Sequence, residues 1–357
     1  MKRLSVFAVL VSMFALSMAC GSSGGGGIEF ADFALKMNMA ALDDVIVTAD
    51  GHYLTAGDTH DDDSVVVAKV GPDGTLIWQK ILDLDGFRVK LAEVSDGYLL
   101  FCALEIPANG DDNDAVMFKL DYDGEIVWEK HYTNGRYDEF RDIYVVGDRI
   151  FALMLIQTGP DWFDQETYLA EFDSNGNPVS GKTVDIDAGV DDNCSFNEIV
   201  SDGTSTYIAG AVYLDGDGRY LIIAKLNESY EVEWCKYFGT GEDCYAEGLT
   251  LHPDGGVVFC AGILGFGAGD YDGFVAHFDA DGTIQWQMTY GTQSYDDVMA
   301  TAFLSDGTMM IAGYTEGTPN SEAAIFIAKL RMNSTLTSGR TFTAMQTFGT
   351  SSEASQS

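Results

Sequence analysis

The architecture of this chain is read most directly from one segment, Phe274-Val-Ala-His-Phe-Asp-Ala-Asp-Gly-Thr-Ile-Gln-Trp286. It holds two short runs suited to β-strands, separated by an Asp-Gly pair, which is the sequence pattern of a β-hairpin. Aligning the residue that lies nine positions before the tryptophan gives six copies along the chain, spaced by 50, 52, 54, 52 and 52 residues. The aligned pairs are Lys69/Trp78, Lys119/Trp128, Glu171/Ser180, Lys225/Trp234, His277/Trp286 and Lys329/Ser338.

Working outward from this hairpin, each copy contains four strand-like runs, here called A to D. In the sixth copy we expect strand A at 298–304, strand B at 309–315 and strand C at 325–330. Turn pairs separate A from B at Asp50-Gly51, Asp96-Gly97, Gly147-Asp148, Asp202-Gly203, Asp254-Gly255 and Asp306-Gly307. Similar pairs separate C from D at Asp73-Gly74, Asp123-Gly124, Asn175-Gly176 and Asp281-Gly282. No stretch of 30–348 has sustained helical periodicity.

Repeated four-stranded antiparallel units of this length are typical of propeller blades, and closing them into a ring removes the open sheet edges. We therefore predict an all-β fold over 30–348, a β-propeller of six blades with four antiparallel strands each. Seven blades is the alternative. Both 30–37 and 341–348 look like a D strand, so either end could complete the last blade.

The aligned tryptophans and lysines are predicted to be structural. A tryptophan at a fixed position in strand D buries a large area, so we expect it to pack one blade on the next. The aligned lysines are expected to pair with nearby turn carboxylates or to extend toward water.

Together with Tyr290-Gly291 and Asp296-Asp297, the segment from Phe274 to Trp286 resembles the β-propeller repeat of bacterial and archaeal surface proteins. The resemblance covers the chain from about Asp43 to Trp286. The tryptophan position is also similar to that of quinoprotein-like propellers, although the spacing from Asp to Trp is one residue shorter. These resemblances imply a propeller fold and a location outside the cytoplasm, and they imply no single activity.

Residues 1–19 are predicted to be a signal peptide, because two basic residues precede an apolar run that is short for a membrane span. Ser17-Met18-Ala19-Cys20 resembles a lipobox, which makes Cys20 the predicted site of lipidation, although the first three residues also suit an ordinary signal peptidase. Residues 20–29 then form a Gly/Ser-rich tether and 349–357 a disordered tail. We expect a lipoprotein of the cell envelope, anchored to the outer membrane or cell surface.

The formal net charge of −37 is distributed among aromatic and β-branched residues, so it does not indicate a disordered acidic tail. Such a field repels nucleic acid, and no basic aromatic patch offsets it. The expected partner is therefore a protein or glycan at the cell envelope, with the lipid anchor in the membrane.

The loops between strands B and C are long and acidic, and with the loops between D and A they should form one face. Their acids could bind calcium as a cofactor, although solvated loop acids are commoner. The candidate metal ligands are Asp61, Asp63, Asp215, Asp217, Asp270 and Asp272. Aromatic residues on this face predict a ligand- or partner-binding spot, with local loop packing as the alternative. These residues are Tyr137, Trp162, Phe163, Tyr271 and Tyr295.

Five cysteines besides Cys20 leave at least one unpaired. Cys194 and Cys244 lie in the same type of loop in neighbouring blades, and an oxidising compartment would allow them to form a disulfide. Cys235–Cys244 is the competing pair.

Catalytic motifs are absent from the sequence: it contains no GxSxG, no HExxH and no P-loop. We therefore predict that the protein is not an enzyme but a binding or scaffolding module acting through its acidic, aromatic loop face. The alternative is a carbohydrate-active or quinone-dependent propeller enzyme. Asp142, Glu198 and Glu247 could supply paired carboxylates for the first, and the second would need cations, for which Arg88, Arg136 and Arg141 are placed.

Overall fold

The computed structural model describes residues 43–58, 64–84, 86–105, 113–160, 165–184, 186, 194–214, 218–304, 307–316, 324–330 and 348–349. Its regular structure there consists of strands in six antiparallel sheets, which confirms the predicted six-bladed β-propeller. Within these residues no helix has the length and apolarity needed to cross a membrane. The chain divides into two compact units, Met1–Gly181 and Lys182–Ser357.

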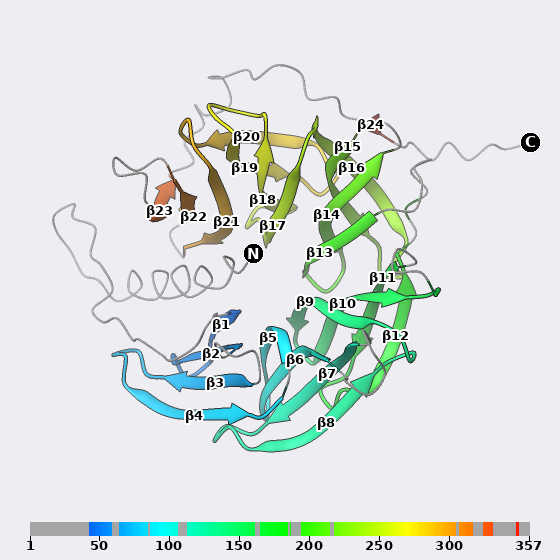
Figure 1. Ribbon diagram of the computed structural model, residues 1–357, viewed down its shortest axis with the longest axis vertical. Coiled ribbons are helices and arrows are strands. Elements are labelled where there is room, and N and C mark those ends of the chain that lie inside the picture. Colours follow the sequence, from blue (N-terminus) through cyan, green and yellow to red (C-terminus); the bar gives the residue numbers. More distant parts are fainter. Residues whose placement is uncertain are drawn as a thin grey trace, which may run out of the picture. The chain divides into compact units, whose positions relative to one another are not determined.

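Unit 1 carries the first three sheets (Figure 1). The first consists of β1 (Asp44–Val47), β2 (Tyr53–Asp58), β3 (Val65–Val70) and β4 (Leu76–Leu82). The second consists of β5 (Gly86–Val94), β6 (Gly97–Glu105), β7 (Asn113–Leu120) and β8 (Ile126–Tyr132). The third consists of β9 (Asp138–Val146), β10 (Arg149–Gln157), β11 (Gln165–Phe172) and β12 (Pro178–Thr183), whose last residues cross the unit boundary.

Unit 2 carries the other three sheets. The fourth consists of β13 (Cys194–Ser201), β14 (Thr206–Leu214), β15 (Gly218–Leu226) and β16 (Val232–Gly241). The fifth consists of β17 (Cys244–Leu251), β18 (Val257–Leu264), β19 (Tyr271–Phe278) and β20 (Ile284–Tyr290). The sixth has β21 (Asp296–Phe303), β22 (Met309–Thr315) and β23 (Ala324–Leu330) within the described residues.

The short β24 (Phe348–Gly349) pairs with β16 of the fourth sheet, Tyr237 opposite Phe348. Of the two segments expected to supply a last D strand, 30–37 and residues 341–347 of the second lie outside the described residues, so which end completes the last blade stays a prediction.

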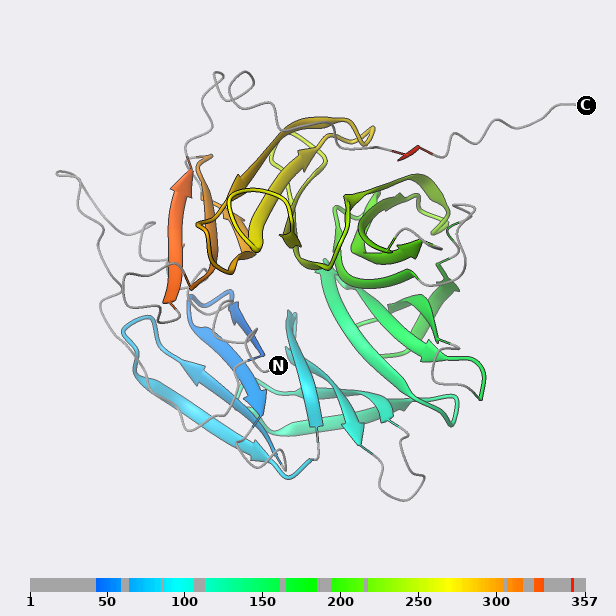
Figure 2. The ribbon, with the colours of Figure 1, turned by 45° about the horizontal axis from the view of Figure 1, so that its top comes forward.

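Within each unit the first strand of a sheet packs on the sheet before it: β5 on β1–β3, β9 on β5–β7, β17 on β13–β15 and β21 on β17–β19. The interfaces are apolar. One buried cluster joins Leu54 and Val67 to Tyr98 and Phe118, and another joins Phe101 to Phe140. Figure 2 shows that the individual sheets are twisted, as β-sheets generally are.

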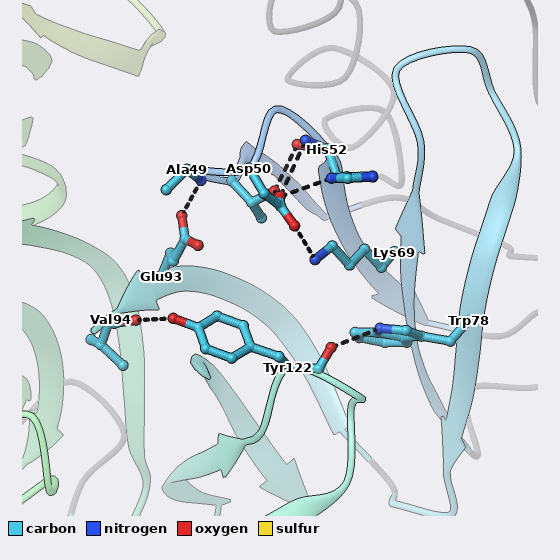
Figure 3. Close-up of polar contacts among 9 residues, drawn as sticks. Ala49, Asp50, His52, Lys69, Trp78, Glu93, Val94 and Tyr122 are labelled. Carbon is cyan, nitrogen blue, oxygen red and sulfur yellow. Dashed lines mark hydrogen bonds and ion pairs between the residues drawn. The ribbon is translucent and has the colours of Figure 1, made fainter. Parts of the chain in front are cut away.

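The predicted tryptophan and lysine roles are seen in the first sheets (Figure 3), whereas Lys225 of the fourth sheet pairs with Glu233 of β16 at 2.7 Å instead of with a turn carboxylate. Trp78 of the first sheet donates its indole N–H to the carbonyl of Tyr122 in the second, at 3.0 Å. Trp234 makes the same bond to Ala280 of the fifth sheet. Lys69 pairs with Asp50 of the A–B turn at 2.7 Å, and Lys119 pairs with Asp96 in the same way. These contacts are therefore part of the repeat itself.

Candidate functional site

Three acidic side chains lie on the first strands of the three sheets in unit 2. They are Glu198 on β13, Glu247 on β17 and Asp297 on β21. Each strand has an irregular register close to its acid, where one residue has no partner on the second strand of the sheet; in β17 this residue is Glu247 itself. A bulge of this kind bends the strand and re-aims its side chains. We call these three residues the acid cluster.

The three acids influence one another electrostatically. Burial raises the pKa of Glu247 well above its usual value, and the negative charges of Asp297 and Glu198 raise it further. Asp297 is only 4% exposed, and burial raises its pKa to about 7. Like charges that are close together cannot all ionise cheaply. The acid cluster therefore retains protons near neutral pH, and its titration belongs to the group rather than to single residues.

The second strand of the fifth sheet, β18, provides the surface on which the acids lie. All three acids raise the pKa of the Cys260 thiol, whose burial has the largest effect. Gly262, two residues later, leaves room for Asp297: a Cβ atom added there would lie 2.7 Å from Oδ1 and 2.8 Å from Oδ2. A glycine at this position is therefore what allows the Asp297 carboxyl group to approach β18.

A series of tyrosine rings runs beside the acid cluster. Tyr245 and Tyr271 stack at 6.0 Å between ring centroids, Tyr271 and Tyr295 lie at 4.8 Å, and Tyr295 and Tyr314 meet edge to face at 5.9 Å. All four rings are partly exposed. We call them the tyrosine row.

The strand registers place the tyrosine row directly next to Asp297. Tyr245 is the pairing partner of Gly262, which contacts the Asp297 carboxyl group, and Tyr314 is the pairing partner of Asp297 itself. Paired residues in an antiparallel sheet lie on the same face. Asp297 is therefore flanked by two partly exposed aromatic rings.

Arg219 and Asp243 hold the tyrosine row at one end. The Arg219 guanidinium lies 4.6 Å from the centre of the Tyr245 ring and pairs with Asp243 at 2.9 Å. The Tyr245 hydroxyl donates a 2.7 Å hydrogen bond to the same carboxylate. Burial would raise the pKa of Asp243, but bonds from Tyr245, Tyr271 and Arg219 hold it below the usual value. Asp243 thus stays ionised and fixes the orientation of the rings.

The aromatic residues predicted from the sequence are distributed over both units. Tyr271 and Tyr295 come together in the tyrosine row. Tyr137 lies in unit 1, is only 9% exposed, and donates its hydroxyl to Glu139 at 2.7 Å. Trp162 and Phe163 lie outside the described residues, as does Cys20.

Of the predicted metal ligands, only Asp270 and Asp272 are described; Asp61, Asp63, Asp215 and Asp217 are not. The carbonyl of Asp270 accepts a hydrogen bond from Gly265. Asp272 is buried, and its Oδ2 accepts 3.0 Å bonds from the backbone N–H groups of Ala268 and Gly269. Among described residues no group of three possible ligands gathers at metal-binding distances. Calcium stays a prediction for the remaining loops.

The predicted disulfide between Cys194 and Cys244 is not formed in this structure. Cys244 is a buried free thiol, and the charged groups that act on it are Arg219 and Asp243. Cys194 instead lies near enough to Cys235 to raise the pKa of that thiol, after the larger effect of burial. The competing Cys235–Cys244 pair is not formed either, since both thiols are free.

The candidate catalytic carboxylates from the sequence separate into two groups. Glu198 and Glu247 are brought together, as their positions suggested, whereas Asp142 pairs with Lys90 in unit 1 at 3.2 Å. Asp297 was missed, because the Asp296-Asp297 pair reads as part of the structural repeat. Of the arginines, Arg88 and Arg141 both contact Glu139, and Arg136 donates to the carbonyl of Gly159.

The comparisons with known proteins give the fold and no closer relationship. No family profile matches the chain, and no curated protein matches it. Among solved structures, puromycin hydrolase has a TM-score of 0.52 at 13% identity, over 80% of this chain and 45% of that one. The chain thus spans less than half of that protein. A thermostable family-43 glycoside hydrolase reaches 0.42 at 10% identity, over 71% of this chain and 94% of that one. A mutant of the Synechocystis apocarotenoid oxygenase reaches 0.47 at 12%, over 82% and 70%.

One of these structures corrects the prediction that the protein is not an enzyme. That prediction treated the lack of sequence motifs on a propeller as a sign of a non-catalytic role. Puromycin hydrolase, which is similar at a TM-score of 0.52, is an enzyme, so a propeller fold that lacks these motifs does not indicate a non-catalytic protein. Because the identity is 13%, the likeness shows the fold alone.

Proposed function

We propose that unit 2 carries a carbohydrate-active site that hydrolyses glycosidic bonds. The observation that supports this most is the acid cluster, in which the pKa values of Glu247 and Asp297 are raised beside a row of partly exposed tyrosines. Glycoside hydrolysis needs a protonated acid for the leaving oxygen and an ionised carboxylate for the water or the sugar. The flat apolar faces of sugar rings pack on aromatic side chains, which the tyrosine row provides.

The chemistry follows from the charges. The Glu247–Asp297 pair holds the proton and donates it to the glycosidic oxygen as the bond from that oxygen to the anomeric carbon breaks. Glu198 takes the role of the base: it accepts a proton from water, whose oxygen bonds to the same carbon. One proton is supplied and one is recovered, so the cluster ends with the charge it had at the start.

The test is hydrolysis of aryl glycosides and of plant and bacterial polysaccharides by the purified chain, followed by release of aryl alcohol or reducing ends. We expect kcat to fall at least ~100-fold in Glu247→Gln, Asp297→Asn and Glu198→Gln, the usual size of a general acid–base contribution. Asp254→Asn is the matched control, because Asp254 is an exposed acid in the A–B turn of the fifth sheet, the sheet that carries Glu247. Parent activity should also decrease as the pH rises through about 7, where Asp297 loses its proton.

Two results would contradict the proposal. One is a parent protein that hydrolyses none of these substrates. The other is hydrolysis that the acid-cluster variants retain at the level of Asp254→Asn, which would place the reaction elsewhere in the chain.

A further inference from the structure

A second charged group, in unit 1, is built around Glu139 of β9, whose side chain is fully buried. Arg88 Nε lies 3.3 Å from Glu139 Oε2, and an Arg141 terminal nitrogen lies 2.5 Å from Oε1. The Tyr137 hydroxyl donates to Oε2 at 2.7 Å. One carboxylate thus lies between two guanidinium groups.

From this geometry we propose that Arg88 and Arg141 form a binding site for the carboxylate of a small molecule, separate from the acid cluster of unit 2. Among these three side chains the two guanidiniums outnumber the one carboxylate, in a chain whose formal net charge is −37. The Arg141 Nε atom is buried and has no hydrogen-bond partner among the described residues. Burial and the Arg88 charge lower the pKa of Arg141, whereas the negative charge of Glu139 raises it. The charged Arg141 side chain is therefore unfavourable where it lies, and a second anion beside it would reduce that electrostatic cost.

The backbone at Arg88 supports a binding role. Arg88 has a φ of +56°, a conformation that is strained for non-glycine residues and that persists only where the surroundings hold it. Asp43 and Asp44 do so by accepting the backbone N–H groups of Val89 and Leu91 at 3.1 and 2.8 Å. The strand register is interrupted between Phe87 and Lys90, which turns Arg88 toward Glu139.

The two arginines differ in access. The Arg88 side chain is 51% exposed, whereas that of Arg141 is 16% exposed. Arg88 can therefore meet a ligand from solvent and Arg141 can fix it from within. A guanidinium fork matches a planar carboxylate through two parallel hydrogen bonds. A carboxylate carries the single negative charge that neutralises the group, whereas a phosphate dianion would exceed it.

The test is isothermal titration of the full chain with sodium D-glucuronate and sodium acetate, with glucose and inorganic phosphate as comparison ligands. We expect both carboxylates to bind, glucose not to bind, and phosphate to bind more weakly. Arg88→Gln should weaken carboxylate binding about tenfold or more, since it removes one charged donor. Arg136→Gln is the matched control, because Arg136 contacts only the Gly159 carbonyl among the described residues and should leave binding unchanged.

Glu139→Gln supplies a second variant with the opposite expectation. Without the competing internal carboxylate, both guanidiniums are available, so carboxylate binding should tighten while the hydrogen-bonding shape of the side chain is kept. The proposal is overturned if neither carboxylate binds, if Arg88→Gln and Arg136→Gln bind equally well, or if phosphate binds more tightly than acetate. Because binding is measured without turnover, these outcomes are independent of any hydrolysis in unit 2.

Discussion

At the scale of single residues, Asp296 and Asp297 show how neighbours in a strand acquire different roles. Asp296 is fully buried, and its Oδ2 accepts bonds from the backbone N–H and the hydroxyl of Thr292 at 2.6 and 2.7 Å. It closes the loop before β21. Asp297 lies on the opposite face of the strand, because successive residues of a strand point to opposite faces. Its carboxyl group lies against Gly262 and interacts electrostatically with the other acids. The first carboxylate is structural, and the second belongs to the proposed site.

The raised pKa of Asp297 predicts a cost in stability. Its folded-state pKa of about 7 exceeds the ordinary value of 3.8, so the folded state binds the proton more tightly between these values. The stabilisation that comes from protonated Asp297 is therefore fully present below about pH 3.8 and is lost as the pH rises through 7. The amide of Asp297→Asn does not titrate, so this loss is absent from the variant. Between pH 4.5 and 8 we expect the free energy of unfolding, measured with urea, to fall less in the variant than in the parent, by on the order of 1–3 kcal/mol.

Asp254→Asn serves again as the control and should keep the parent's pH dependence. Equal pH dependence in the parent and in Asp297→Asn would mean that Asp297 titrates normally. A gain in stability at pH 8 accompanied by loss of hydrolysis would be the trade-off expected of a residue kept for function.

At the scale of elements, the contact between neighbouring blades follows a pairing rule. The tryptophan of one D strand packs on the turn glycine of the next sheet: Trp78 on Gly124, Trp128 on Gly176 and Trp234 on Gly282. A Cβ atom at these glycines would lie 2.6 to 2.9 Å from the indole. The equivalent turn of the fourth sheet has Tyr230, with a φ of +58°, and the aligned residue one repeat earlier is Ser180 rather than tryptophan.

This rule predicts a steric cost that can be separated from backbone strain. Gly124 and Gly51 have nearly the same positive φ, +81° and +78°, but only Gly124 has a neighbour where a Cβ would stand. Gly51→Ala should lose about 1–2 kcal/mol from its left-handed backbone. Gly124→Ala should lose a further ~1–3 kcal/mol from the clash with Trp78. Denaturant unfolding of both variants measures the difference, and equal losses would show that the indole contact is not tight.

At the scale of the whole molecule, the six sheets repeat one design while the chemistry does not repeat. The acid cluster and the tyrosine row belong to unit 2, and the Arg88–Glu139–Arg141 group belongs to unit 1. The same position in strand A carries Asp44, Lys90, Asp142 and Glu198 in successive sheets, each opposite the same position of strand B. The repeat therefore supplies equivalent positions, and each unit uses its own side chains there.

Membrane anchoring through Cys20 stays a prediction, because Cys20 lies outside the described residues. If the thiol is lipidated, Cys20→Ala should move the protein from the membrane fraction of a bacterial host to the soluble exported fraction. Ser22→Ala, in the adjacent tether, is the control and should stay with the membranes. Cell fractionation and immunoblotting measure the distribution, and a Cys20→Ala variant that stays in the membrane fraction would rule out this anchor.

The strand order, the turn positions and the number of blades were predictable from the sequence because they depend on local chemistry repeated six times. In the sixth sheet the expected strand B, 309–315, matches β22 residue for residue. The A–B turn glycines have positive φ in all six sheets, as an Asp-Gly or Gly-Asp turn requires. Spacing along the chain is enough to reveal such features, and the tryptophan and lysine roles follow from the same register.

The candidate site depended on tertiary structure. The sequence made Glu198 and Glu247 candidates by their positions but could not separate them from the chain's many other acids, and it gave no reason to prefer Asp297 over Asp296. Their electrostatic coupling arises only when residues about fifty positions apart are packed together and buried. The same holds for the tyrosine row and for Glu139 between two arginines. Burial and proximity shift a pKa, and neither is a property of the local sequence, whereas strand alternation and turn chemistry are.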